Sequence, residues 1–93
     1  MQLWKPVEWD LAKNKLLREE REVSFEDVVA AIEGGNLLDV IPHPNRKKYP
    51  HQRIFLVIIR SYVYEAPFVE DDTKIFLKTI IPNSNATKRY LSK

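Results

Sequence analysis

The chain has no cysteine and only two glycines, and each shortage excludes a class of chemistry. Without cysteine there is neither a disulfide nor thiol chemistry. The pair Gly34-Gly35 cannot supply the glycine-rich loops with which common nucleotide-binding motifs hold phosphates. The longest apolar run, Ile54 to Ile59, is far too short to span a bilayer, and the first residues lack the apolar run of a signal peptide. We therefore expect one soluble, cytoplasmic domain over residues 1–93 that uses no cofactor and contacts no membrane.

Histidines and catalytic motifs are equally sparse. His43 and His51 are the only histidines, and no carboxylate cluster stands near them, so they do not reach the ligand count of a usual metal site. No Gly-x-Ser-x-Gly segment is present, which argues against a serine hydrolase. The carboxylate runs Glu19-Glu20 and Glu70-Asp71-Asp72 are interpreted as a helix face and a turn, not as paired catalytic acids.

Charge, by contrast, is distributed very unevenly along the chain. Residues 1–42 carry five Lys or Arg and nine Asp or Glu, a net charge of −4. Residues 43–93 carry ten basic and four acidic residues, a net charge of +6, so the overall +2 hides the asymmetry. The basic half also holds all four tyrosines. A basic and aromatic half of this kind favours a surface that binds a polyanion.

Two helices are predicted in the acidic half, over residues 11–21 and 25–33. Asp10 and Ser24 stand where N-cap residues would accept hydrogen bonds from the first turns. Gly34-Gly35 ends the second helix, because glycine readily takes the left-handed conformation that closes a helix. The apolar residues of the first helix are expected to lie on roughly one face: Leu11, Leu16 and Leu17.

Four strands and a short last helix are predicted in the basic half. The strands cover residues 37–41, 53–60, 62–69 and 74–81, and the helix covers 85–91. Pro67 restricts its strand to a sheet edge or a bulge, because proline has no N–H to donate. Consecutive strands with short connections form an antiparallel meander. The expected fold is α+β, with two N-terminal helices, a four-stranded antiparallel sheet and a short C-terminal helix.

Several short segments, spread over nearly the whole chain, resemble one family of bacterial toxins. The N-terminal segments are similar to the signature of BrnT-type toxins: Glu8-Trp9-Asp10, Lys13 and Val23-Ser24-Phe25-Glu26. Later segments resemble a related branch of that superfamily: Tyr49-Pro50-His51-Gln52-Arg53, Tyr64-Glu65-Ala66-Pro67-Phe68-Val69-Glu70, Lys78-Thr79-Ile80-Ile81-Pro82 and Ala86-Thr87-Lys88-Arg89-Tyr90.

The resemblance implies a RelE-like microbial ribonuclease fold and a metal-independent, RNA-cleaving toxin of a type II toxin–antitoxin pair. It also implies a cognate antitoxin protein, encoded alongside, that holds the toxin inactive and can form a hetero-oligomer with it. The chain departs from the family at one place. Ser84 and Asn85 stand where members usually carry one or two basic residues, which puts RNA cleavage by this chain in question.

Metal-free RNA cleavage needs a base for the 2′-hydroxyl, cations for the phosphate and an acid for the leaving oxygen. The candidate catalytic residues are His51, Arg53, Lys78 and Tyr62. Lys78 is the strongest catalytic candidate, because side chains alternate along a strand and this alternation puts Lys78 on the outward face, away from the core. The core face is expected to carry Ile75, Leu77, Thr79 and Ile81, and the outward face Lys74, Phe76, Lys78 and Ile80.

Further basic and aromatic residues are candidates for binding RNA through phosphate contacts or base stacking. They are Arg46, Lys47, Lys48, Arg60, Tyr64, Lys88, Arg89 and Tyr90. Arg53 and Arg60 stand seven residues apart on one predicted strand and should therefore point to opposite faces.

Each candidate also has an ordinary structural explanation. His51 fits a solvated loop histidine, Lys78 a solvated lysine, and Arg53 with Arg60 the charged ends of a strand. Tyr90 with Leu91 could simply hold the last helix against the sheet. The alternative function is accordingly a non-catalytic RNA- or protein-binding module on the same fold.

Overall fold

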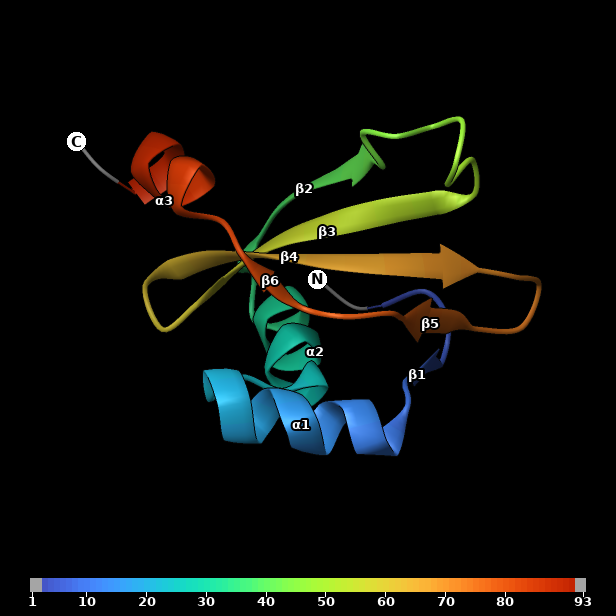
Figure 1. The fold of residues 1–93 in the computed structure, drawn as a ribbon, viewed down its shortest axis with the longest axis horizontal. Helices are drawn as coiled ribbons and strands as arrows, with labels where there is room; N and C mark the ends of the chain where they lie inside the picture. Colours follow the sequence, from blue (N-terminus) through green and yellow to red (C-terminus); the bar gives the residue numbers. More distant parts are fainter. Residues whose placement is uncertain (1–2, 92–93) are drawn as a thin grey trace.

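Two helices lie in the first half of the chain and a third near its end in the computed structural model, which describes residues 3–91 (Figure 1). The elements in chain order are β1 (Val7–Glu8), α1 (Leu11–Arg21), α2 (Phe25–Glu33), β2 (Leu37–Pro42), β3 (Gln52–Ile59), β4 (Tyr62–Glu70), β5 (Ile75–Leu77), β6 (Ile81–Pro82) and α3 (Ser84–Leu91). Within the described part of the chain, the helices are too short or too polar to cross a membrane.

The sheet has six strands and is mixed. Its order is β1-β5-β4-β3-β2, with β6 paired to β4, and over residues 3–91 only the β1·β5 pair is parallel. Figure 1 shows α1 and α2 on one side of the sheet and α3 on the other. The predicted α+β class and the meander β2 to β5 are confirmed, whereas the predicted count of four strands, all antiparallel, is wrong. β1, which was not predicted, and β6, which was predicted only as the end of the strand 74–81, have two residues each and carry no periodicity that a sequence could display.

Both N-terminal helices begin at the predicted caps. Asp10 accepts hydrogen bonds from Ala12 N and Lys13 N at 2.8 and 3.2 Å. Ser24 forms a capping box, because its hydroxyl accepts from Asp27 N at 3.2 Å while the Asp27 carboxylate accepts from Ser24 N at 2.9 Å. Gly35 then takes a left-handed φ of 86° just beyond α2, as predicted for the glycine pair.

The buried stripe of α1 differs from the predicted one. Leu17 is buried, but Leu11 is 80% exposed and Leu16 is 44% exposed. Asn14, one helical turn before Leu17, takes the buried place instead. Its Oδ1 accepts from Phe25 N at 2.7 Å, and its Nδ2 donates to Glu26 Oε1 at 2.7 Å. The inner face of α1 thus holds the first turn of α2 through a polar side chain.

The main core lies between α1, α2 and one face of the sheet. Its buried members are Leu17, Val23, Phe25, Val28, Ala31, Ile32, Phe55, Val57, Ile59, Ala66, Phe68, Ile75, Leu77 and Ile80. Phe55 and Phe68, on neighbouring strands, stack with ring centroids 4.0 Å apart. Burial of these apolar side chains supplies most of the stabilisation of such a small domain.

The predicted strand 74–81 is broken by a bulge into β5 and β6. β5 pairs Leu77 with Phe68, whereas β6 pairs Pro82 with Tyr64. Four steps along β4, from Phe68 to Tyr64, therefore match five steps from Leu77 to Pro82. One extra residue lies opposite β4, which is the definition of a β-bulge.

The bulge reverses the alternation of side chains after Lys78. Ile80 is fully buried and joins the core, while Ile81 is 41% exposed, the opposite of the predicted faces. A shift of one residue moves every following side chain to the other face of a sheet. Pro67 lies opposite the bulge and its carbonyl accepts from Lys78 N at 2.8 Å. The interior strand β4 therefore tolerates proline at a bulge, one of the two places predicted.

Candidate functional site

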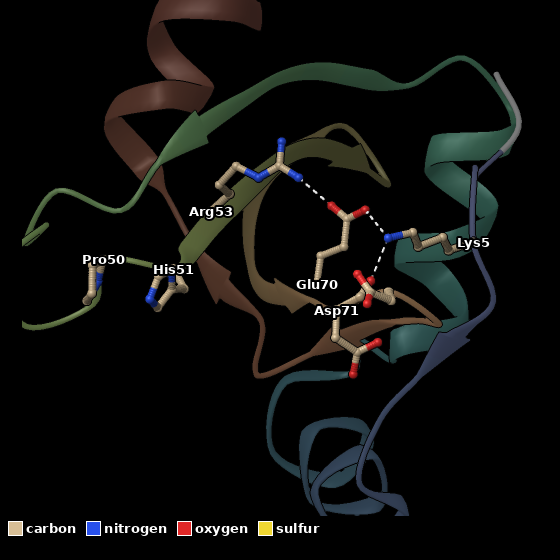
Figure 2. A pocket seen from close by; sticks show the side chains of 7 residues that line it. Lys5, Pro50, His51, Arg53, Glu70 and Asp71 are labelled. Atoms are coloured by element: carbon tan, nitrogen blue, oxygen red, sulfur yellow. Dashed lines mark hydrogen bonds and ion pairs between the residues drawn. The ribbon is translucent and has the colours of Figure 1, made fainter.

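One open cavity of about 380 Å³ lies at the end of the sheet where β3 begins and β4 ends. It lies between the N-terminal segment before β1, the loop before β3, the first residues of β3, the end of β4 and the turn after β4 (Figure 2). The lining residues are Lys5, Pro50, His51, Arg53, Glu70, Asp71 and Asp72. We call this set the Glu70 cavity.

Glu70 is the centre of the polar contacts in this cavity (Figure 2). Its Oε1 lies 2.6 Å from Nη2 of Arg53, and its Oε2 lies 2.8 Å from Nζ of Lys5. The indole Nε1–H of Trp4 donates to the same Oε2 at 2.8 Å. Lys5 also donates to the backbone carbonyl of Asp71. Three elements far apart in sequence are therefore joined at a single carboxylate.

These donors lower the pKa of Glu70 below its ordinary value, with the hydrogen bond from Lys5 contributing most and that from Trp4 next. Donors that bind the charged form of a carboxylate favour that form. Glu70 is consequently a carboxylate at neutral pH and can accept protons or hydrogen bonds, but does not donate them.

Arg53 occupies a position that leaves much of its guanidinium available. The guanidinium carbon lies 5.1 Å from the Phe68 ring centroid, and the side chain is 47% exposed. Glu70 contacts one terminal nitrogen, while a guanidinium carries five N–H donors. Stacking on Phe68 therefore orients a cation that can still bind an incoming anion.

His51 completes the cavity from the loop that precedes β3. It is exposed and lines the same cavity as Arg53. Figure 2 shows His51 next to Pro50, on the same side of Glu70 as Arg53. An imidazole can both give and take a proton near neutral pH. The cavity thus brings together two of the four predicted catalytic residues, His51 and Arg53.

Asp71 shapes the turn beside the cavity. Its Oδ1 accepts from Thr73 N at 2.8 Å, Thr73 Oγ1 at 3.0 Å and Lys74 N at 2.9 Å. The two backbone hydrogen bonds are the main causes that lower the pKa of Asp71 to about 2. This turn positions the end of β4, and with it Glu70.

The depressed pKa of Asp71 makes a prediction about acid stability. A carboxyl group whose folded pKa lies below its unfolded pKa stabilises the fold above the unfolded value, and the contribution is lost as pH falls through the folded value. The stability difference between the wild type and Asp71→Ala should therefore be constant above pH 4 and shrink between pH 4 and about 2. Urea denaturation across that range measures it, and a difference that does not change with pH would contradict it.

Lys78, the leading candidate from the sequence, lies elsewhere. Arg53 pairs with Phe68 and Phe68 with Leu77, so Arg53 shares the face of Leu77. Lys78 follows Leu77 and its Nζ lies 5.6 Å from the centroid of the Phe76 ring on the opposite face. Lys78 is exposed as predicted, but the residues that line the Glu70 cavity do not include it.

The two tyrosines of β4 lie at the far end of that strand from Glu70. Tyr62 begins β4, which Glu70 ends. The rings of Tyr62 and Tyr64 meet edge to face at 5.6 Å, and Tyr64 packs against the core. They form an aromatic pair, and Tyr62 is not brought to His51 and Arg53.

Arg60 lies in the β3–β4 turn and not on a strand, which corrects the prediction that it flanks β3 opposite Arg53. Arg60 and Ser61 take left-handed φ values of 49° and 65°. The Arg60 guanidinium donates to the backbone carbonyl of Glu22 and lies 3.5 Å from Asp27. Arg60 therefore ties the hairpin to the junction of α1 and α2.

The remaining basic candidates occupy two other regions. Arg46, Lys47 and Lys48 are exposed in the loop that leads to His51, with Lys48 Nζ 5.2 Å from the Tyr49 ring centroid. Lys88, Arg89 and Tyr90 lie exposed on α3. A second cavity of about 190 Å³ borders that helix and is lined by Ile41, Leu56, Glu65, Asn83, Asn85, Ala86, Arg89 and Tyr90.

Lys5, Trp4 and Glu70 are the residues that sequence reasoning missed. Glu70 could have been found, because a two-residue turn at 60–61 pairs Arg53 with Phe68 and so brings Glu70 within reach on the same face. Lys5 and Trp4 offered no such signal, since their partner Glu70 lies 65 and 66 residues away. Over residues 3–91, His, Asp and Glu form no group of three placed to hold a metal ion.

Comparisons with protein-family models, with curated proteins and with solved structures were made for the whole chain. None of the three gave a match.

Proposed function

We propose that this protein is a metal-independent endoribonuclease that cleaves RNA through attack by its own 2′-hydroxyl. The observation that carries the proposal is the Glu70 cavity, where an imidazole, a guanidinium, an ammonium group and three carboxylates, among them Glu70, line one open space. These are the kinds of group that such a reaction uses as base, acid and phosphate-binding cations.

In the proposed reaction Glu70 takes the proton from the 2′-hydroxyl. The 2′-oxygen then bonds to phosphorus, and the bond from phosphorus to the 5′-oxygen breaks. His51, in its protonated form, gives a proton to that leaving oxygen. The products are a 2′,3′-cyclic phosphate and a free 5′-hydroxyl, with Glu70 protonated and His51 neutral until water returns both to their starting states.

Arg53 and Lys5 have two successive roles in this scheme. In the free protein both bind Glu70, at 2.6 and 2.8 Å. When a phosphate enters the cavity, both cations can turn to its oxygens, which compensates the charge that builds on phosphorus. Glu70 keeps the hydrogen bond from Trp4 but loses its two cationic partners in the same step, so its proton affinity rises just when a base is needed.

We further propose that the chain is the toxin of a toxin–antitoxin pair, on the strength of the resemblance and of the charge asymmetry. The segment 43–93 has a net charge of +6, and its exposed cations include Arg46, Lys47 and Lys48. An acidic segment of an antitoxin and an RNA backbone would compete for the same positive field.

A non-catalytic binding module is the second candidate, and one observation favours it. Ser84 and Asn85 begin α3 where the resembling family carries basic residues, and Asn85 lines the second cavity together with Arg89 and Tyr90. This arrangement can stack and hydrogen-bond an unpaired base without any proton transfer.

The deciding experiment is cleavage of end-labelled single-stranded RNA by the purified chain in the presence of EDTA. We expect fragments that end in a 2′,3′-cyclic phosphate, because the groups of the Glu70 cavity need no metal ion. Circular dichroism confirms that the sample is folded. RNA that stays intact with folded protein would overturn the free ribonuclease and favour a binding module or an enzyme that acts only on the ribosome.

A further inference from the structure

Trp4 is the large aromatic side chain beside the Glu70 cavity that the proposed chemistry leaves unused. Its indole is 44% exposed, although its N–H edge is fixed by a hydrogen bond of 2.8 Å to Glu70 Oε2. Glu70 Oε2 also contacts Lys5 Nζ at 2.8 Å. One carboxylate oxygen therefore separates the indole from a cation of the cavity.

The indole is supported by the core on its other side. Its ring meets Phe55 edge to face, with centroids 6.0 Å apart and planes at 63°. Phe55 stacks on Phe68 at 4.0 Å, and Arg53 lies 5.1 Å from the Phe68 ring. Trp4 and Arg53 are thus held by the same pair of buried rings.

A rigid, exposed ring at this place has a chemical use. Exposure of an indole to water is unfavourable, and here the ring is held in a fixed orientation by Glu70 and Phe55. Nucleobases stack on aromatic side chains, and the base of a nucleotide lies within a few ångströms of its own phosphate.

We propose that Trp4 is the platform on which a nucleobase stacks when the adjacent phosphate binds Arg53 and Lys5. This inference rests on the proposed function and adds a substrate class to it. A base can stack on a protein ring only after it leaves its neighbours in a duplex, so the substrate is single-stranded RNA. The stacking contact is tolerant of sequence, because every base has an aromatic face.

The test compares two probes that differ only by the base, adenosine 5′-monophosphate and ribose 5-phosphate. Isothermal titration calorimetry should show the wild type binding the nucleotide at least about tenfold more tightly than the sugar phosphate. In Trp4→Leu that ratio should fall to about one, and in Trp4→Phe most of it should remain, because phenylalanine keeps an aromatic face. Using the ratio removes any change in phosphate binding that follows from losing the Trp4–Glu70 hydrogen bond.

A fluorescence experiment gives an independent reading. Trp9→Phe leaves Trp4 as the single tryptophan, because the chain has two. Its emission should be quenched by adenosine 5′-monophosphate and not by ribose 5-phosphate. A ratio near one in the wild type, or one that Trp4→Leu leaves unchanged, overturns the platform.

The outcomes separate this inference from the ribonuclease proposal. RNA cleavage with equal binding of the two probes removes the platform and leaves the ribonuclease standing. Base-dependent binding that Trp4→Leu abolishes, with intact RNA, keeps the platform and removes the catalytic proposal. Failure of both probes to bind, together with RNA that stays intact, overturns both proposals.

Discussion

Arg53→Ala is expected to lower the rate of RNA cleavage by about a hundredfold to a thousandfold, the usual effect of removing a group that stabilises charge in a transition state. Arg53 is stacked on Phe68 and bonded to Glu70, so its orientation is set before any substrate arrives. Initial rates on single-stranded RNA, with EDTA present, measure the effect. Arg18→Ala is the matched control, because Arg18 is an exposed arginine of α1 that pairs with Glu26 at 2.9 Å.

The comparison of Arg53→Ala with Lys78→Ala decides which face of the sheet carries the chemistry. The sequence favoured Lys78, whereas the cavity brings His51 and Arg53 together with Glu70. Lys78→Ala should therefore reduce RNA affinity modestly and leave the rate at saturating RNA almost unchanged. If Lys78→Ala abolishes cleavage while Arg53→Ala does not, the reaction takes place on the α3 side and the Glu70 cavity has another use.

Asn14→Ala is expected to destabilise the fold by about 2–3 kcal/mol, a large share of the stability of a domain this small. Asn14 is only 4% exposed, and its Oδ1 accepts the N–H of Phe25 at 2.7 Å. Alanine leaves that buried N–H without its acceptor and also removes the donor to Glu26. Because the hydrogen bond from Asn14 is the main cause that lowers the pKa of Glu26, the variant should also raise that pKa.

Urea denaturation at neutral pH measures the change in the free energy of unfolding. Asn14→Asp should lie between the wild type and Asn14→Ala, since it keeps an acceptor for Phe25 N and sets a second negative charge near Glu26. Lys15→Ala, at the next and exposed position of α1, serves as the control for helix propensity. A loss in Asn14→Ala no larger than in Lys15→Ala would show that the buried amide is not needed to join α1 and α2.

The helices were predictable because their boundaries depend on neighbours in sequence. Asp10 and Ser24 cap the first turns through atoms two or three residues away, and Gly35 supplies the left-handed residue after α2. The same holds for the hairpin of β3 and β4, whose turn at 60–61 joins two strands of clear apolar character. Local chemistry therefore gave the α+β class and the order of the main elements.

The residues of the candidate site were predictable only in part. His51 and Arg53 stood out as a histidine and an arginine near a strand that is buried further along. Glu70 was interpreted as one member of a turn cluster, because nothing within its own segment shows that Lys5 and Trp4 reach it. A carboxylate is identified as a site residue by its partners, and here the partners come from another part of the chain.

The sequence by itself determined the two capped helices and the meander from β2 to β5, since their signals lie in neighbouring residues, and it determined the charge asymmetry, which depends on composition alone. Tertiary structure alone decided the parallel pairing of β1, the bulge that buries Ile80, the buried place of Asn14 and the assembly of the Glu70 cavity. The physical reason is the same for all four. Each depends on hydrogen bonds or packing between segments whose separation is set by the whole fold, and such contacts leave no periodicity or spacing in the chain.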